Sequence, residues 1–86
     1  MPPHATPDLA LAVGVSDETI RRWAKWGLIP PPERANLGSR GNVSRWTDEA
    51  LQQALWVKGQ LDAGRSKGEI LAALRAGEYA PRSSGS

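Results

Sequence analysis

Three positively charged residues within one short stretch offer the clearest chemistry in this sequence of 86 residues. Arg21, Arg22 and Lys25 are spaced so that a helix places all three on one side. Such a group of cations binds phosphates, and an arginine can also donate two hydrogen bonds to the edge of a guanine base. The group therefore predicts a surface that binds a polyanion. The alternative is a solvated basic helix face without a ligand.

Residues that could support catalysis or metal binding are scarce. The chain has no cysteine and a single histidine, His4, which excludes a disulfide framework and a thiolate metal site. Adjacent carboxylates occur at Asp17 and Glu18, and again at Asp48 and Glu49. Each pair falls in the first turn of a predicted helix, where negative charge stabilises the helix dipole. We therefore expect no enzyme, no catalytic residue, no metal site and no cofactor.

A helix over 17–26 is predicted to carry the three cations. Ser16 is a good N-cap, and Gly27 suits the left-handed conformation that ends many helices. The residues opposite the cations are Ile20, Trp23, Ala24 and Gly27. This face lacks charge, so it is predicted to pack on the core while the basic face stays exposed.

A shorter helix is predicted before it. Thr6 is expected to be its N-cap, with Pro7 at the first helical position and Gly14 at its end. Its expected buried residues are Leu9, Ala12 and Val13. The connection from Gly14 to Ser16 has three residues, the length of the turn in a helix-turn-helix motif.

The segment after the basic helix favours a β-hairpin. Three successive prolines, 30–32, exclude helix, and turn-forming residues between Glu33 and Trp46 leave a short strand on either side. We expect this hairpin to be a wing with a basic tip; the alternative is a loop without strands. Its cations are Arg34, Arg40 and Arg45.

Two further helices are predicted in the remainder of the chain. The longer one covers 48–63, with Thr47 as its N-cap and Gly64 after it, and Ser66 and Glu69 form a capping box for a helix over 67–75. The apolar positions expected on one side of the longer helix are Leu51, Ala54, Leu55, Val57 and Leu61. Trp56 lies outside this stripe, so it either packs on a second neighbour or faces a protein partner or second protomer.

Charge is distributed unevenly along the chain, although its net value is only +2. Residues 21–45 hold six basic residues against Glu33 alone, a net charge of +5, whereas the rest holds five basic and eight acidic residues, a net charge of −3. A basic centre between acidic ends is the pattern expected of a polyanion-binding surface. We expect one domain over 6–77, a disordered N-terminus over 1–5 and a flexible tail over 78–86. The sequence shows no transmembrane segment or signal peptide, which predicts a cytoplasmic, nucleoid-associated protein without membrane contact.

From about Thr6 to Leu74 the chain resembles the DNA-binding domain of the MerR family, most specifically in its first half. The matching motifs are the Gly-Val-Ser corner at 14–16, Thr-Ile-Arg at 19–21 and Gly-Leu-Ile-Pro-Pro at 27–31. The wing motif corresponds more loosely to 41–46. Arg22 stands where the family has an aromatic residue, and Ser44 replaces an arginine of the wing. Compared with the family, the chain lacks the coiled-coil dimerisation helix and the effector domain, so no small-molecule effector is expected.

The resemblance implies a mainly α winged helix-turn-helix with a small β-hairpin, in the order helix-helix-wing-helix-helix. Its expected function is sequence-specific binding of double-stranded DNA as the DNA-binding domain of a bacterial transcription regulator. One alternative is an architectural or phage-type DNA binder, similar to excisionases, chromosome-anchoring proteins or terminase small subunits; another is a protein-interaction module. The residues expected to contact DNA are Ser16, Thr19, Arg21, Arg22, Lys25, Arg34, Arg40 and Arg45.

Overall fold

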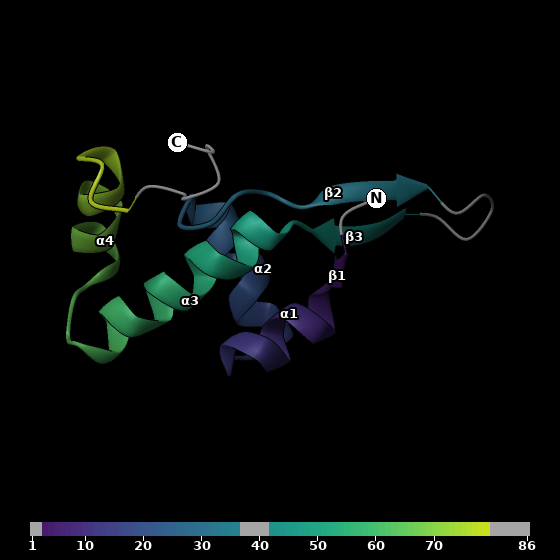
Figure 1. The fold of residues 1–86 in the computed structure, drawn as a ribbon, viewed down its shortest axis with the longest axis horizontal. Helices are drawn as coiled ribbons and strands as arrows, with labels where there is room; N and C mark the ends of the chain where they lie inside the picture. The colour runs from purple at the N-terminus through teal and green to yellow at the C-terminus, as the bar shows by residue number, and fades with distance from the viewer. Residues whose placement is uncertain (1–2, 37–41, 80–86) are drawn as a thin grey trace.

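The computed structural model describes residues 3–36 and 42–79 of the chain and contains the predicted elements in the predicted order, plus one additional strand (Figure 1). The elements are β1 (His4–Ala5), α1 (Thr6–Val13), α2 (Asp17–Trp26), β2 (Glu33–Asn36), β3 (Asn42–Trp46), α3 (Asp48–Asp62) and α4 (Lys67–Arg75). The hairpin lies at one end of the molecule and α4 at the other, with α3 between them and α1 and α2 beside it. The predicted fold class is confirmed.

Local sequence signals define α2 as predicted. The Ser16 hydroxyl accepts a hydrogen bond of 3.1 Å from the backbone N–H of Thr19, and Gly27 has a φ of 85°, which a residue with a side chain rarely adopts. Ile20 and Trp23 are buried in the core. The helix is therefore held by its apolar face and leaves its basic face outside.

The start of α1 differs from the prediction. Ala5 occupies the N-cap position without a side-chain hydrogen bond, and Thr6 is the first helical residue. The buried Thr6 hydroxyl instead accepts a hydrogen bond of 2.8 Å from the indole N–H of Trp46. Because this indole is almost fully buried, it needs an acceptor inside the protein. A long-range contact has thus replaced the local cap.

One of the three residues predicted to be buried on α1 is exposed. Leu9 and Val13 are buried as expected, but Ala12 is exposed and Ala10 is buried in its place. With Thr6, the buried positions follow the helical spacing i, i+3, i+4 and i+7, which excludes Ala12.

The hairpin belongs to a three-stranded antiparallel sheet in the order β1-β3-β2. Arg45 of the central strand lies opposite Glu33 on one side and Ala5 on the other. The expected hairpin is confirmed, and two residues of the N-terminus expected to be disordered, His4 and Ala5, pair with β3. The sequence missed β1 because two residues are too few to show strand periodicity.

The caps of α3 and α4 follow the prediction. Thr47 accepts a hydrogen bond from the N–H of Ala50, and Ser66 and Glu69 form the expected capping box. The third helix ends one residue earlier than expected, with Ala63 as its C-cap. Within the described ranges, no helix is long and apolar enough to cross a membrane.

Side-chain packing along α3 corrects one expected core residue, Leu55, and explains the lysine at position 58. Leu55 is half exposed, whereas Ala50, Ala54 and Val57 are buried. Lys58 interrupts the apolar stripe without burying an unpaired charge, because its ammonium lies 2.8 Å from the carboxylate of Asp62. The core consists of Leu9, Ala10, Val13, Ile20, Trp23, Leu28, Ile29, Trp46, Ala50, Ala54, Val57 and Ile70.

Trp56 packs within the chain. It is partly buried against the core, and its ring centre lies 5.2 Å from that of Tyr79 at a tilt of 40°. Such a tilted arrangement is favourable for two aromatic rings. Tyr79 lies beyond the predicted end of the domain at residue 77, so residues 78 and 79 pack on the domain as well. Glu78 adds an ion pair of 3.1 Å with Arg65.

Candidate nucleic-acid interface

The outer face of α2 presents three cations to solvent. Arg21, Arg22 and Lys25 are all exposed, and they line one shallow surface hollow together with Glu18 and Trp26. The structure therefore brings the three predicted cations of the helix onto one surface. Within the described part of the chain, Arg21 and Lys25 have no ion-pair partner, so their charges are available to an incoming anion.

Arg22 is held more firmly than its two neighbours. Its guanidinium donates a hydrogen bond of 2.7 Å to the Glu18 carboxylate one turn earlier, and lies 6.0 Å from the ring centre of Trp26 one turn later. The ion pair is largely exposed, with 51% and 74% of the two side chains accessible. Exposed pairs at this spacing contribute only about 0.3–0.5 kcal/mol, so a phosphate can displace Glu18.

Ser16 and Thr19 contact each other at the start of α2. Their hydroxyl oxygens lie 2.9 Å apart, while the Ser16 oxygen also accepts the N–H of Thr19. Ser16 is exposed and Thr19 is half-buried. Both hydroxyls therefore sit beside the positive end of the helix dipole, where a phosphate oxygen is favoured.

A second groove connects α2 to the base of the wing. Its lining residues are Arg21, Ala24, Lys25, Pro31, Pro32, Ser44 and Trp46. Arg21 and Lys25 thus border both this groove and the hollow on the outer face of α2. The groove therefore leads from the cationic residues of the helix to uncharged residues at the base of the wing.

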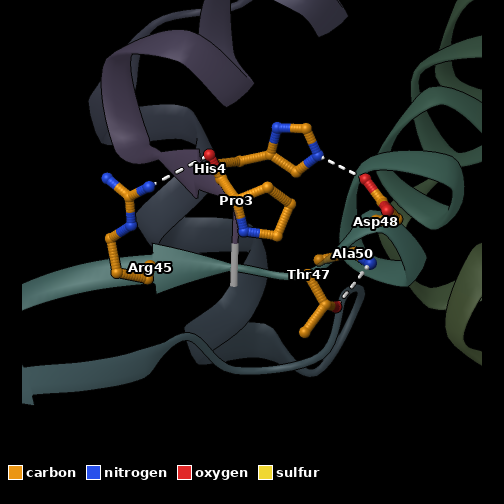
Figure 2. A network of polar contacts seen from close by, with 6 residues as sticks. All are labelled: Pro3, His4, Arg45, Thr47, Asp48 and Ala50. Atoms are coloured by element: carbon orange, nitrogen blue, oxygen red, sulfur yellow. Dashed lines mark hydrogen bonds and ion pairs between the residues drawn. The ribbon is translucent and has the colours of Figure 1, made fainter. Parts of the chain in front are cut away.

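The wing cations are placed differently from those of α2. Arg45 is half-buried, and its guanidinium donates a hydrogen bond of 3.0 Å to the backbone carbonyl of Pro3 (Figure 2). Arg34 lies in β2 opposite Ser44, and Arg40 lies outside the described residues. Arg45 therefore fixes the N-terminal segment to the sheet, which its sequence position did not suggest.

Two of the carboxylates and the histidine contact other side chains of the chain. Glu18 accepts from Arg22, and Asp48 lies 2.6 Å from Nε2 of His4 at the start of α3 (Figure 2). Among the described residues, no group of three or more His, Cys, Asp or Glu side chains could hold a metal ion.

Sequence reasoning missed one contact at this surface. The ammonium of Lys67, the first residue of α4, lies 4.2 Å from the ring centre of Trp26. No periodicity connects two residues so far apart in sequence. The sequence did contain one indication of this contact. A cation in the first turn of a helix is unfavourable for the helix dipole, so a lysine at position 67 indicates a partner outside α4.

The fold and the basic surface agree with the family comparison. A family model described as MerR HTH family regulatory protein matches residues 6–77. The chain therefore belongs to the MerR family of helix-turn-helix regulatory proteins, and the predicted resemblance is confirmed.

Three individual proteins are similar to this chain. A ZntR homologue of Haemophilus influenzae, an HTH-type transcriptional regulator, is 41% identical over 49 residues, which are 57% of this chain and 33% of that protein. HiNmlR, a MerR family regulator lacking the sensor domain and solved bound to promoter DNA, aligns with a TM-score of 0.67 and 27% identity, covering 85% of this chain and 52% of that one. A Listeria monocytogenes protein described as a MerR family transcriptional regulator aligns with a TM-score of 0.68 and 31% identity, covering 87% and 56% of the two chains. The chain thus spans a third to just over half of the length of these relatives.

Proposed function

We propose that this chain binds double-stranded DNA as the DNA-binding part of a transcription regulator, with α2 in the major groove. The observation that carries the proposal is the exposed cationic face of α2, whose Arg21 and Lys25 also border the groove that reaches the base of the wing. With ten residues, α2 is about 15 Å long and of a width that the major groove admits. Membership of a family of regulatory proteins and the similarity to a regulator bound to promoter DNA support the same function.

The proposal divides the work between helix and wing. On α2, Arg21, Arg22 and Lys25 contact base edges and phosphates, and Ser16 and Thr19 contact phosphates at the start of the helix. An arginine on a guanine contributes about 1–3 kcal/mol of discrimination against other bases. On the wing, Arg34, Arg40 and Arg45 contact the flanking backbone or minor groove, which adds affinity rather than sequence choice.

A protein partner at Trp56 is not needed for this function. The ring of Trp56 already packs against Tyr79 and the core. A second protomer on neighbouring DNA would still raise affinity, because a single module covers a short site.

A titration with duplex DNA at two salt concentrations tests the proposal. The duplex is selected from a randomised library by the wild-type chain and compared with a scrambled duplex. The three exposed cations of α2 alone predict a slope of log affinity against log salt of about −3. Replacing Arg21 and Arg22 together by alanine is expected to abolish the preference for the selected duplex.

A control variant tests whether loss of any positive charge, rather than loss of the cations of α2, weakens DNA binding. Arg75 is also exposed, but it lies in the last turn of α4 and lines neither the hollow on α2 nor the groove. Arg75→Ala is expected to bind both duplexes like the parent. Equal binding by the Arg21→Ala, Arg22→Ala chain and the parent would refute the assignment of α2. Salt-dependent binding without preference would indicate an architectural DNA binder instead.

A further inference from the structure

Trp26 is an exposed aromatic residue placed between two cations from different helices. Its side chain is 38% exposed, and its ring centre lies 6.0 Å from the Arg22 guanidinium and 4.2 Å from the Lys67 ammonium. Both distances fall within the range of a cation–π attraction. The ring therefore contacts two cations in addition to its place at the end of α2.

Arg22 needs such a neighbour if it is to read a base. A free arginine side chain loses considerable rotamer entropy when it is immobilised on a ligand, and this cost falls if the side chain is already restrained. Glu18 restrains Arg22 as well, but its negative charge repels the phosphates that approach. Trp26 carries no charge, so it can hold Arg22 both before and after an anion arrives.

Lys67 restrains the ring from the other side. A lysine at the first position of α4 is unfavourable for that helix, so α4 itself gives no reason for it. Helix α4 lies against the end of α2, since a Cβ atom on Gly27 would lie 4.0 Å from Cδ2 of Leu71. This packing allows the ammonium of Lys67 to reach the ring of Trp26.

We infer that Trp26 is a positioning residue for DNA recognition, which holds Arg22 in its base-reading geometry and is itself held by Lys67. The inference rests on the proposed function. The inference gives Trp26 a role that the spacing of the cations on α2 does not indicate. It also means that α4, through Lys67, supports the surface that contacts DNA.

A double-mutant cycle between Trp26 and Arg22 tests the inference on the full 86-residue chain with the selected and scrambled duplexes. Trp26→Leu keeps an apolar side chain but removes the ring, and it is expected to weaken binding of the selected duplex about two- to fivefold. Trp26→Phe keeps a ring and should retain most of the affinity. In the Arg22→Ala background, Trp26→Leu should cause no further loss, because the residue it positions is absent. An equal loss in both backgrounds, or no loss in either, would overturn the inference.

Glu18→Gln provides a second variant at an exposed position that does not endanger the fold. If Trp26 positions Arg22, loss of the carboxylate leaves affinity unchanged or raises it, because a repulsive charge is removed. If Glu18 is the residue that positions Arg22, affinity falls and the inference is wrong. Failure of the proposed function looks different, since the parent would then bind DNA no better than the chain with Arg21→Ala and Arg22→Ala.

Discussion

Replacing Thr6 by valine should destabilise the protein through one buried hydrogen bond. Valine has nearly the shape of threonine, so the change leaves no cavity but removes the acceptor of the Trp46 indole N–H, 2.8 Å away. Thr6 is 6% exposed and Trp46 is 1% exposed, so water cannot replace the lost partner. An unsatisfied buried donor costs about 1–3 kcal/mol. In a chain of this size, each kcal/mol lowers Tm by about 4–8 °C.

Thermal and urea unfolding followed by circular dichroism measure this effect. Thr6→Ser, which keeps the acceptor, should lose less stability than Thr6→Val. In a Trp46→Phe background no indole N–H remains, and Thr6→Val should then cost less than about 0.5 kcal/mol. Stability of Thr6→Val equal to that of the parent, or the same loss with and without the indole, would refute the reasoning.

Three further predictions concern stability and ionisation. Gly27→Ala should destabilise the protein by about 1–2 kcal/mol, because φ is 85° at this position. Gly59→Ala, inside α3 with open space around it, should instead stabilise the protein by about 0.5–1 kcal/mol. Urea unfolding midpoints compare the two variants, and a change of stability in the same direction for both would contradict the argument. Ser66→Ala should cost about 1 kcal/mol through loss of the capping box, and an unchanged Tm would show that the box contributes nothing. Burial, and to a smaller extent the negative charge of Glu49, raises the pKa of Tyr79, the single tyrosine. The protonated phenol therefore stabilises the folded state below about pH 10, and this stabilisation is lost as pH rises through the pKa of the folded state. Absorbance of the tyrosinate should therefore appear at higher pH in the parent than in Glu49→Gln, and identical curves would exclude the charge effect.

Helix caps and turn residues were predictable because they act within a few residues. Ser16, Thr47 and Ser66 each accept the backbone N–H three positions later, as their sequence context indicates. Gly14 and Gly27 have the positive φ values expected at helix ends. The cationic face of α2 was predictable for the same reason, since helical spacing alone places its residues together.

Long-range pairing accounts for what the sequence did not reveal. Thr6 resembles an N-cap locally, yet its hydroxyl is taken by Trp46 from 40 positions away. Arg45 resembles a free wing cation, yet the carbonyl of Pro3 binds it. Trp26 and Lys67 likewise meet only when α4 packs against the end of α2. In each case, the tertiary fold makes a contact that the local sequence does not indicate.

The central position of β3 in the sheet has a consequence for the order of folding. Helices α1 and α2, and strands β2 and β3, are neighbours in sequence and close short loops, which form quickly. Pairing of Ala5 with Arg45 closes a loop of about 40 residues, which carries a larger entropic cost. A polypeptide made from its N-terminus must therefore extend to residue 46 before its first strand can pair. While the chain grows from residue 26 to residue 46, the helix-turn-helix exists without the strand that later fixes its beginning.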